Sequence, residues 1–535
     1  MIYIHRRPLI WRTLWPARSC FPAAVLRSVA DMYHGGTNFG HTAGQGISTS
    51  YDYNAPLTEF GFAREPKYGV LKRLHAVLHT FEAVIVGTEP AAQWWSQGVA
   101  GMPGLSLYNY TNKVAFLVNS NRTVDFTVRY NCTASAVRVA APAPAPDDDD
   151  IPVPTASSLS LEVTVPHWSV TIVDGDACSA VFSTATEPDA RPPPPPAEAG
   201  PAGSPSSDWS FWVEPTDLAW CRDAGRLRTL AKLPEHIDFT GGPLVTDYLL
   251  AEAELPAGPL PAGTALTAMP SPAVGGPLGG VARVDGFVDG RGFSVTPGWP
   301  VSLPTGSSGG PLHLRMSIQG LPNYLWSNKL CKNGGCNGDW DSHLENYDQG
   351  LLGQILLNST SSTASAGSSG MVVTNLTDAG WRVCAGLHGE ALNLSSPVAA
   401  DPPGGWQAGT RPLSATGTWV RLQLPLPTLA AANTSVGVGL NLTGMAEGEA
   451  WVNGHSLGRY TLHVLPSEPA CTVCNRTGPY DPNGECHFRC NKLAEPLYHA
   501  PRGWLNHHSV NNTVVLWERE SGADPSKVSF ASVVG

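Results

Sequence analysis

One short region of the sequence gathers the residue types that bind a sugar. Residues 32–40 read MYHGGTNFG, and residues 50–57 read SYDYNAPL. A sugar offers a face of C–H bonds and a rim of hydroxyl groups, so its site combines aromatic rings with amide and carboxylate hydrogen bonds. The side chains here that could make such contacts are Tyr33, Asn38, Phe39, Tyr51, Asp52, Tyr53 and Asn54. By residue type alone, the same rings could equally belong to a hydrophobic core.

A second motif permits the chemistry of an esterase. Residues 454–458 read GHSLG, which matches the G-x-S-x-G nucleophile elbow of α/β-hydrolases, and residues 34–37 (HGGT) resemble their oxyanion loop. An elbow needs a helix after its serine, whereas here an Asn453-Gly454 pair precedes Ser456 and RYTLHV follows it. This pattern favours a β-hairpin. Asp481 and His499 could complete a triad, but any long tail would supply such residues, so the esterase is a remote alternative.

Hydrolysis of a glycoside with retention of configuration requires two carboxyl groups about 5 Å apart. The acids near the first motif are Asp31, Asp52, Glu59 and Glu65. They nominate no acid–base and nucleophile pair, so no catalytic residue is assigned. No cofactor or metal site is assigned either. The acidic run at residues 147–150 lies among Ala-Pro repeats and is most simply a solvated loop, with a calcium site as the less favoured alternative.

Cysteine spacing and glycosylation sequons indicate an oxidising compartment. Four cysteines follow a C-x2-C-x11-C-x3-C pattern that by itself would also suit zinc, and two others flank a short loop. We expect disulfides rather than zinc, because ten Asn-x-Ser/Thr sequons favour the secretory route. The disulfide candidates are Cys331, Cys336, Cys471, Cys474, Cys486 and Cys490. The glycosylation candidates are Asn109, Asn121, Asn131, Asn358, Asn375, Asn393, Asn433, Asn441, Asn475 and Asn511.

We therefore expect a secreted protein of the cell wall or of a vacuole- or lysosome-like compartment. Residues 1–30 contain five arginines, no acid and only short apolar stretches. They do not form a signal peptide in the chain as it stands. Their composition is typical of a transit peptide or of a truncated or mispredicted start, and we favour the second interpretation.

Composition limits the fold and the partners. The 535 residues include 56 Gly, 48 Pro and 17 Trp, only 14% are charged, and the formal net charge is −11. Many turns and few charges favour short strands over long helices, so we expect a mainly β protein. The negative charge disfavours a nucleic-acid partner. No apolar run approaches the ~20 residues that span a membrane.

The elements that would position the motifs follow from hydrophobic periodicity. Residues 64–86 carry apolar side chains at three- and four-residue steps and predict one amphipathic helix. Short β-rich runs follow at 114–118, 124–129, 159–165 and 169–173, and again at 312–318, 419–424 and 514–517. Residues 185–207 are rich in Pro, Gly, Ala and Ser, which predicts a semi-rigid linker.

These motifs together resemble the plant-type β-galactosidases of glycoside hydrolase family 35. The resemblance covers HGGTNFG and TSYDYNAPL and then continues along the chain through residues 165–172, 320–324, 345–350, 386–394, 448–460, the four-cysteine cluster and 498–506. It implies that the first motif and the helix at 64–86 are the last strand and helix of a (β/α)8 barrel. The chain would then be the C-terminal portion of such an enzyme, lacking most of the barrel. Galactose-binding-like β-sandwich or jelly-roll domains would follow.

The resemblance also implies a galactose-containing oligo- or polysaccharide as partner. Its substrate-binding residues would be Tyr51, Tyr53, Asn38 and Tyr33, with Tyr53 bonding the galactose. Asp31 stands where the family usually has tyrosine, which puts one sugar contact in doubt. The two segments that carry the family's catalytic glutamates have no match here. We therefore expect a β-galactosidase lineage with a chain that is inactive alone. A non-catalytic carbohydrate-binding or structural glycoprotein is the alternative.

The expected division is a barrel remnant at 1–86, a β-sandwich at 87–184, the linker at 185–207, and two jelly-roll-like sandwiches at 208–350 and 351–535. A lone barrel strand and helix would leave an apolar face uncovered. We therefore expect residues 1–86 to be poorly ordered or prone to aggregation in isolation.

Overall fold

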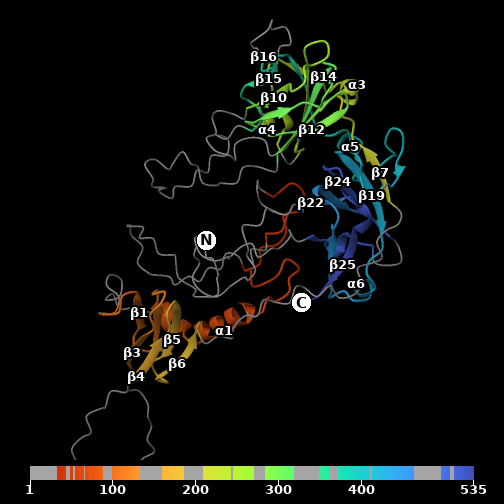
Figure 1. Cartoon of the computed structure of the whole chain (residues 1–535). Coiled ribbons are helices and arrows are strands. Elements are labelled where there is room, and N and C mark those ends of the chain that lie inside the picture. The colour runs from red at the N-terminus through yellow and green to blue at the C-terminus, as the bar shows by residue number, and fades with distance from the viewer. Residues whose placement is uncertain are drawn as a thin grey trace, which may run out of the picture.

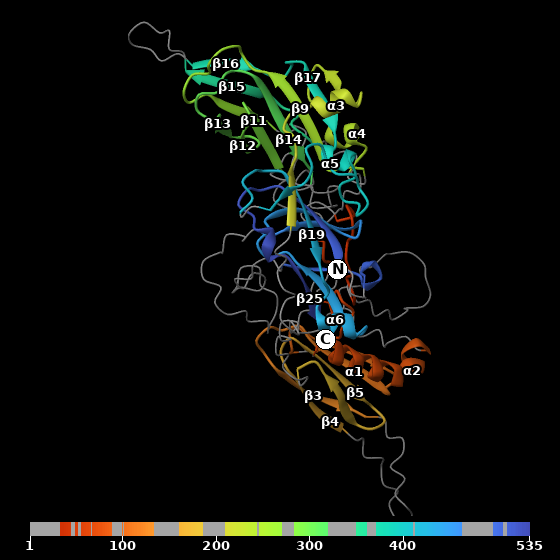
Figure 2. The same ribbon diagram turned by 90° about the vertical axis from the view of Figure 1, so that its right-hand side faces the viewer.

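The computed structural model of the chain contains three β-sandwich bodies (Figure 1). It describes residues 33–43, 49–51, 55–65, 67–87, 99, 101–132, 160–185, 209–242, 245–269, 283–318, 349–360, 371–409, 412–462, 496–506 and 511–534. The molecule is mainly β, as the sequence predicts. In both views the C-terminal sandwich lies between the other two bodies (Figures 1 and 2).

The first body is a sheet covered on both faces. Strands β1 (Leu105–Tyr110), β2 (Val114–Asn119), β5 (Ser169–Asp174) and β6 (Ser179–Ser183) form it in that order, and the pair β3 (Phe126–Asn131) and β4 (Ser160–Val165) covers one face. Helices α1 (Lys67–Thr80) and α2 (Glu82–Gly87) cover the other face. Burial on both faces explains why the first five residues of β2, VAFLV, are all apolar instead of alternating with polar residues.

The helical region differs from prediction in two ways. The single helix expected at 64–86 is two helices, because the chain turns at Phe81 between them. The apolar face that was expected to lie bare is covered, since Leu71, Leu74 and Ile85 pack against Phe116 and Ile172 of the sheet. The preceding motif forms isolated bridges such as Thr37–Ser50, and no regular strand occurs in the described residues between 33 and 65.

The middle body is a sandwich of two antiparallel sheets. Strands β12 (Arg291–Val295), β11 (Arg283–Val288), β14 (Pro311–Ser317), β9 (Tyr248–Glu254), β17 (Trp381–Ala385) and β8 (Arg228–Leu230) form the larger sheet in that order. Strands β13 (Pro300–Ser302), β10 (Ala265–Ala268), β15 (Ile355–Thr360) and β16 (Met371–Asn375) form the smaller one. Two short helices, α3 (Ala219–Asp223) and α4 (His236–Thr240), belong to the same stretch of chain. Leu249, Leu266, Val284, Leu312 and Ile355 lie between the sheets.

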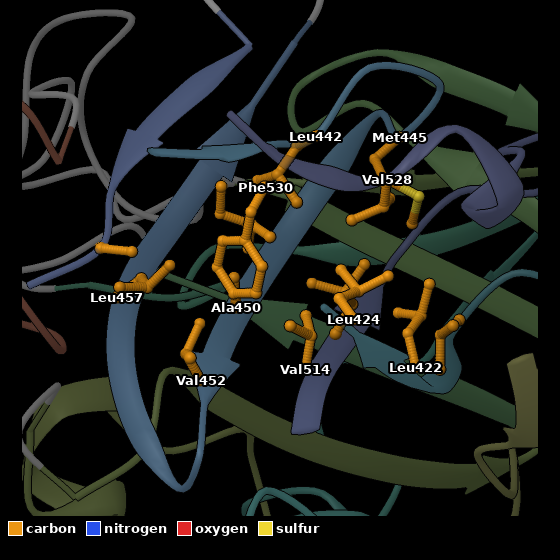
Figure 3. Close-up of a cluster of buried hydrophobic side chains, with 14 of the residues drawn as sticks. Leu422, Leu424, Leu442, Met445, Ala450, Val452, Leu457, Val514, Val528 and Phe530 are labelled. Atoms are coloured by element: carbon orange, nitrogen blue, oxygen red, sulfur yellow. The ribbon is translucent and has the colours of Figure 1, made fainter. Parts of the chain in front are cut away.

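The C-terminal body is a second such sandwich. One sheet has the order β18 (Gln407–Ala408), β7 (Trp209–Val213), β19 (Thr418–Leu424), β24 (Asn512–Glu518), β21 (Glu447–Val452) and β22 (His455–Thr461). The other has β23 (Leu497–His499), β20 (Gly437–Asn441) and β25 (Ser529–Val533). Helices α5 (His388–Ala391) and α6 (Thr428–Ala432) complete it. Figure 3 shows its core, where Leu422 and Val514 from the first sheet lie with Phe530 from the second.

The sheets do not divide at residue 350, where the sequence predicts a boundary. Strands β15, β16 and β17 follow that point and pair within the middle sandwich. Strand β7 precedes the middle sandwich in sequence and pairs with β19 of the C-terminal one. The middle sandwich is therefore inserted between two adjacent strands of the C-terminal sandwich. Hydrophobic pattern marks strands, but it does not show which sheet each strand joins.

Candidate functional site

The motif segment, residues 33–65, folds back on itself so that its two halves lie together. The amide of Asn38 donates to the carbonyl of Thr49 (2.7 Å), and the amide of Tyr51 donates to the carbonyl of Gly36 (3.0 Å). These bonds bring Asn38 and Tyr51, two of the four predicted sugar-binding residues, onto facing stretches of chain. Tyr53 lies outside the described residues.

Tyr33 stands apart from that pair. Its ring packs against the rings of Tyr68 (centroids 6.3 Å apart) and His75 (6.4 Å) on α1. Partial burial, with Tyr68 nearby, raises the pKa of Tyr33. The ring therefore helps to seat the helix, which is the packing role that the sequence also allowed for these aromatics.

The motif segment docks on the C-terminal sandwich. The amide of Gly40 donates to the carbonyl of Ser456 (3.2 Å), and the hydroxyl of Thr49 donates to the carbonyl of Arg459 (2.5 Å). A Cβ on Gly458 would lie 3.0 Å from the Gly40 carbonyl oxygen, and the φ of Gly458 is +106°. Glycine is needed there because another backbone approaches closely. In Figure 1 the motif segment (red) runs alongside the C-terminal sandwich (blue).

Aromatic contacts reinforce this docking. Phe39 meets Trp504 edge to face (centroids 4.7 Å apart), and Phe60 meets His499 in the same way (4.9 Å). Thr37 Oγ1 lies 3.1 Å from His499 Nδ1 and donates to Glu59 (2.7 Å). Burial, with a smaller effect of His34, lowers the pKa of His499 to about 4, so its imidazole is neutral.

A buried cluster of charged side chains joins the motif segment to both larger sandwiches. We call His41, Asp247, Glu449 and Arg459 the ionic joint. His41 Nε2 lies 2.7 Å from Glu449 Oε2, and Arg459 holds Asp247 through Nε and, at 2.7 Å, through Nη2. Arg459 Nη1 also donates to the carbonyl of Ala43 (3.0 Å). Asp247 and Glu449 are each 2% exposed, so these interactions lie out of water.

Two side chains extend the joint. The hydroxyl of Tyr248 donates to Glu449 (3.3 Å), and Thr246 donates to Glu390 (2.8 Å) at the start of α5. Asp247 precedes β9 of the middle sandwich, whereas Glu449 and Arg459 face each other across the hairpin of β21 and β22. Three parts of the fold therefore meet at one buried point.

Electrostatics set the protonation of this cluster. The facing Glu449 raises the pKa of His41 to about 10, so the imidazole is charged at neutral pH. Burial raises the pKa of Glu390 to about 8, with a further contribution from Glu449, so that carboxyl is protonated. Burial also raises the pKa of Asp247 to about 6 despite its bonds to Arg459. Burial acts in the same sense on Glu449, but His41 and Arg459 hold the pKa of that carboxyl below its ordinary value.

Carboxyl groups whose pKa values are pushed apart are also found in glycosidase active sites. Here Asp247 and Glu449 are closed off from solvent, and they are already bonded to Arg459 and His41 respectively. Atoms of His41, Asp247 and Glu449 that could bind a metal lie within 4.8 Å of one another. The guanidinium and imidazolium already neutralise those carboxylates. The geometry therefore supports an ion-pair network that holds the fold together.

The G-x-S-x-G motif is a hairpin, as the sequence predicts. Asn453 and Gly454 have φ values of +50° and +84°, and Ser456 lies in β22 with strand continuing to Thr461. Ser456 Oγ accepts from the amide of Gly458 (3.2 Å). The strand–turn–strand order lacks the helix that a nucleophile elbow requires.

The described cysteines form two disulfides that the sequence did not nominate. Cys132 at the end of β3 pairs with Cys178, and Cys221 on α3 pairs with Cys384 on β17. The partners are 46 and 163 residues apart, so spacing carries no signal for them. All six predicted disulfide cysteines lie outside the described residues.

The described sequons differ in accessibility. Five asparagines are exposed: Asn131, Asn375, Asn393, Asn433 and Asn511. Four are half-buried: Asn109, Asn121, Asn358 and Asn441. Asn475 lies outside the described residues.

Within the described part of the chain, no helix has the length and apolar character needed to cross a membrane.

Comparison with known proteins finds matches for both the motif segment and the part of the C-terminal sandwich on which it docks. Residues 27–78 match the glycosyl hydrolases family 35, and residues 418–511 match the β-galactosidase galactose-binding domain. The chain is 29% identical over 524 residues to β-galactosidase 8 of Arabidopsis thaliana, which covers 94% of this chain and 51% of that protein. It is 28% identical over 532 residues to β-galactosidase 6 of Oryza sativa subsp. japonica, with 94% and 52% covered. The chain thus spans about half the length of the curated relatives it matches.

Proposed function

Since this chain is a relative of the plant β-galactosidases of glycosyl hydrolase family 35, we propose that it recognises terminal β-galactose units. One observation carries the proposal. The two matched regions, which lie at opposite ends of the sequence, meet through the bonds from Gly40 to Ser456 and from Thr49 to Arg459. A galactose-directed motif is thereby seated on a galactose-binding domain.

Asn38 and Tyr51 are the described residues that we assign to the sugar. An amide and a phenol hydroxyl can each bond to the rim of hydroxyls on galactose, and a ring can lie on its C–H face. We place Tyr53 in the same group. Tyr33 has a lesser part, because its ring already packs on α1.

We propose that the full family reaction is hydrolysis with retention, which needs two carboxyl groups with different roles. Both described acids of the motif segment are engaged elsewhere. Glu59 accepts from Thr37 (2.7 Å), and Glu65 accepts from the amide of Gly69 in the first turn of α1 (3.0 Å). We therefore expect this chain by itself to bind galactosides and to hydrolyse them at background rate. A non-catalytic carbohydrate-binding glycoprotein is the second candidate that this observation favours.

We also propose an oxidising compartment of the secretory route, with the cell wall or a vacuole- or lysosome-like organelle as destinations. The two disulfides and the exposed sequons support it, because disulfides persist mainly in such compartments. Expression in a secreting host followed by mass spectrometry would test it. Free thiols at Cys132 and Cys221 together with unmodified asparagines would contradict the proposal.

The experiment for the sugar proposal combines calorimetry and turnover. Galactose is titrated into the purified chain, with glucose as the control sugar, and a chromogenic β-galactoside is added in a separate assay. We expect galactose to bind more tightly than glucose, and Y51F to weaken that binding. Turnover like that of a full-length relative would refute the expected inactivity, and equal or absent binding of both sugars would refute the galactose assignment.

A further inference from the structure

The motif segment is held on both sides of Asn38 and Tyr51, the residues that we assign to the sugar. On one side lie the bonds of Gly40, His41 and Ala43, and on the other lies the bond of Thr49. Asn38 and Tyr51 are each two residues from such a bond. All four attachments end on β21 or β22 of the C-terminal sandwich.

We propose that Glu449 and Arg459 are positioning residues. Through the ionic joint they fix the position of the chain that carries Asn38 and Tyr51, and they do not touch the sugar themselves. This inference rests on the proposed function, and it assigns the galactose-binding domain a task beyond its own contacts with sugar.

Arg459 is the central residue of this arrangement. Its guanidinium holds Asp247 of the middle sandwich and the Ala43 carbonyl of the motif segment, and its own carbonyl accepts from Thr49. A planar guanidinium with several donors fixes the relative orientation of the groups that it bonds. The side chain therefore ties the segment to two sandwiches at once.

His41 supplies the second tie, and its charge matters. The charged and titratable groups that act on it are Glu449 on β21, Asp247 before β9 and Arg459 on β22. Tyr248 donates to Glu449, and Glu390 interacts electrostatically with Glu449 and His41. An imidazolium bonded to a buried carboxylate is stronger than a neutral contact, because water does not screen it. Loss of the proton would weaken this tie, because a neutral imidazole can still donate one hydrogen bond but carries no charge.

Apolar docking alone would not give the same precision. Phe39 and Phe60 bring the segment to the sandwich, but ring contacts tolerate sliding and rotation. Small displacements of a binding group cost much of its effect. The ionic joint supplies the directional part of the contact.

The test uses the full-length chain in five forms: the unmodified protein, H41Q, H41K, E449Q and H79Q. His79 near the end of α1 forms an exposed pair with Glu82 at the start of α2 (3.0 Å), so H79Q removes the same kind of pair outside the ionic joint. E449Q is a second variant for the joint, and circular dichroism with thermal melting confirms that each protein is folded. Hydrogen exchange of the amides of Asn38, Gly40 and Tyr51 reports the position of the segment, and calorimetry reports galactose affinity.

We expect H41Q and E449Q to speed exchange at those amides and to weaken galactose binding by about tenfold, the loss of one or two polar contacts. H41K should recover most of the affinity because it restores the positive charge, and H79Q should match the unmodified chain. Affinity of the unmodified chain should fall as the pH is raised toward 10, whereas the profile of H41Q should be flat over that range.

Three results would overturn the proposal. Unchanged exchange in H41Q and E449Q would show that the joint does not hold the segment. Faster exchange with unchanged galactose affinity would show that the joint is structural only. If the unmodified chain bound no galactose at all, the proposed function itself would fail, and the positioning role with it.

Discussion

Two neighbouring parts of the chain are anchored by opposite means. The motif segment at 33–65 is held by backbone hydrogen bonds, ring contacts and a buried ion-pair network on the C-terminal sandwich. The helices at 67–87 are held by apolar side chains such as Leu71 and Leu74 on the first sandwich. Apolar burial is non-directional and scales with area, whereas charged hydrogen bonds fix orientation and depend on pH. The comparison indicates that the contacts of the motif segment fix its orientation, whereas the contacts of the helices mainly contribute to the stability of the first sandwich.

The largest effect expected from this contrast is that of E449Q. Removing one partner of a buried ion pair leaves the other charge uncompensated, so we expect a loss of about 3–5 kcal/mol in the free energy of unfolding. Denaturant unfolding followed by fluorescence measures it. E390Q is the matched control, because the Glu390 carboxyl is already protonated at neutral pH and an amide replaces it closely. Similar losses in both variants would contradict the assigned protonation.

The next effect is that of L71A on the apolar side. Leu71 is 2% exposed, and truncating a buried leucine removes transfer energy and leaves a cavity, at about 2–4 kcal/mol. We expect L71A to destabilise the first sandwich and to leave the hydrogen exchange of the Gly40 and Tyr51 amides unchanged. Faster exchange at those two amides would show that the two anchors are not independent.

Stability should decline as the pH rises from about 6.5 to about 10, and His41 is a cause. The pKa of His41 is about 10 in the folded chain and about 6.5 in the unfolded chain, so the folded state binds the extra proton throughout this window. Its stabilisation is complete below about pH 6.5 and is lost as the pH rises toward 10, at about 1.4 kcal/mol per pH unit. Glu390 contributes a decline of the same sign up to about pH 8.

Thermal melting of the unmodified chain and of H41Q at pH 7, 8, 9 and 10 measures this decline. H41Q should show a shallower slope, and the comparison cancels the tyrosines and lysines that titrate in both proteins. Parallel slopes would exclude His41 as the source.

The smallest effect is expected for H79Q. The pair of His79 and Glu82 has the same chemistry as the pair of His41 and Glu449, but its side chains are 76% and 64% exposed. Water and salt screen such a pair, so the change in unfolding free energy should stay below about 0.5 kcal/mol. A loss comparable to that of H41Q would mean that burial is not what distinguishes the two pairs.

Local pattern predicted much of the fold. The mainly β class, the strands β2, β5, β19 and β24 and the turn at Asn453-Gly454 were all readable, because each depends on neighbours within a few residues. The resemblance of the two ends of the chain to β-galactosidases was equally a property of the sequence, and the family comparisons confirm it. The assignment of Asn38, Tyr51, Tyr53 and Tyr33 to a sugar stays a prediction.

Tertiary structure alone decided which parts meet. The sequence predicts a hairpin turn at Asn453-Gly454, but the bulge between Ala450 and Trp451 shifts the register of the hairpin so that Glu449 faces Arg459 instead of Gly458. It shows a histidine after HGGTNFG, but only the docking of distant segments puts His41 on Glu449 and Asp247 on Arg459. The insertion of the middle sandwich between β7 and β19 of the C-terminal sandwich, and both disulfides, likewise depend on contacts between distant parts of the chain. Local propensity acts over a few residues, whereas a buried charge is stabilised only by partners that the whole fold brings to it.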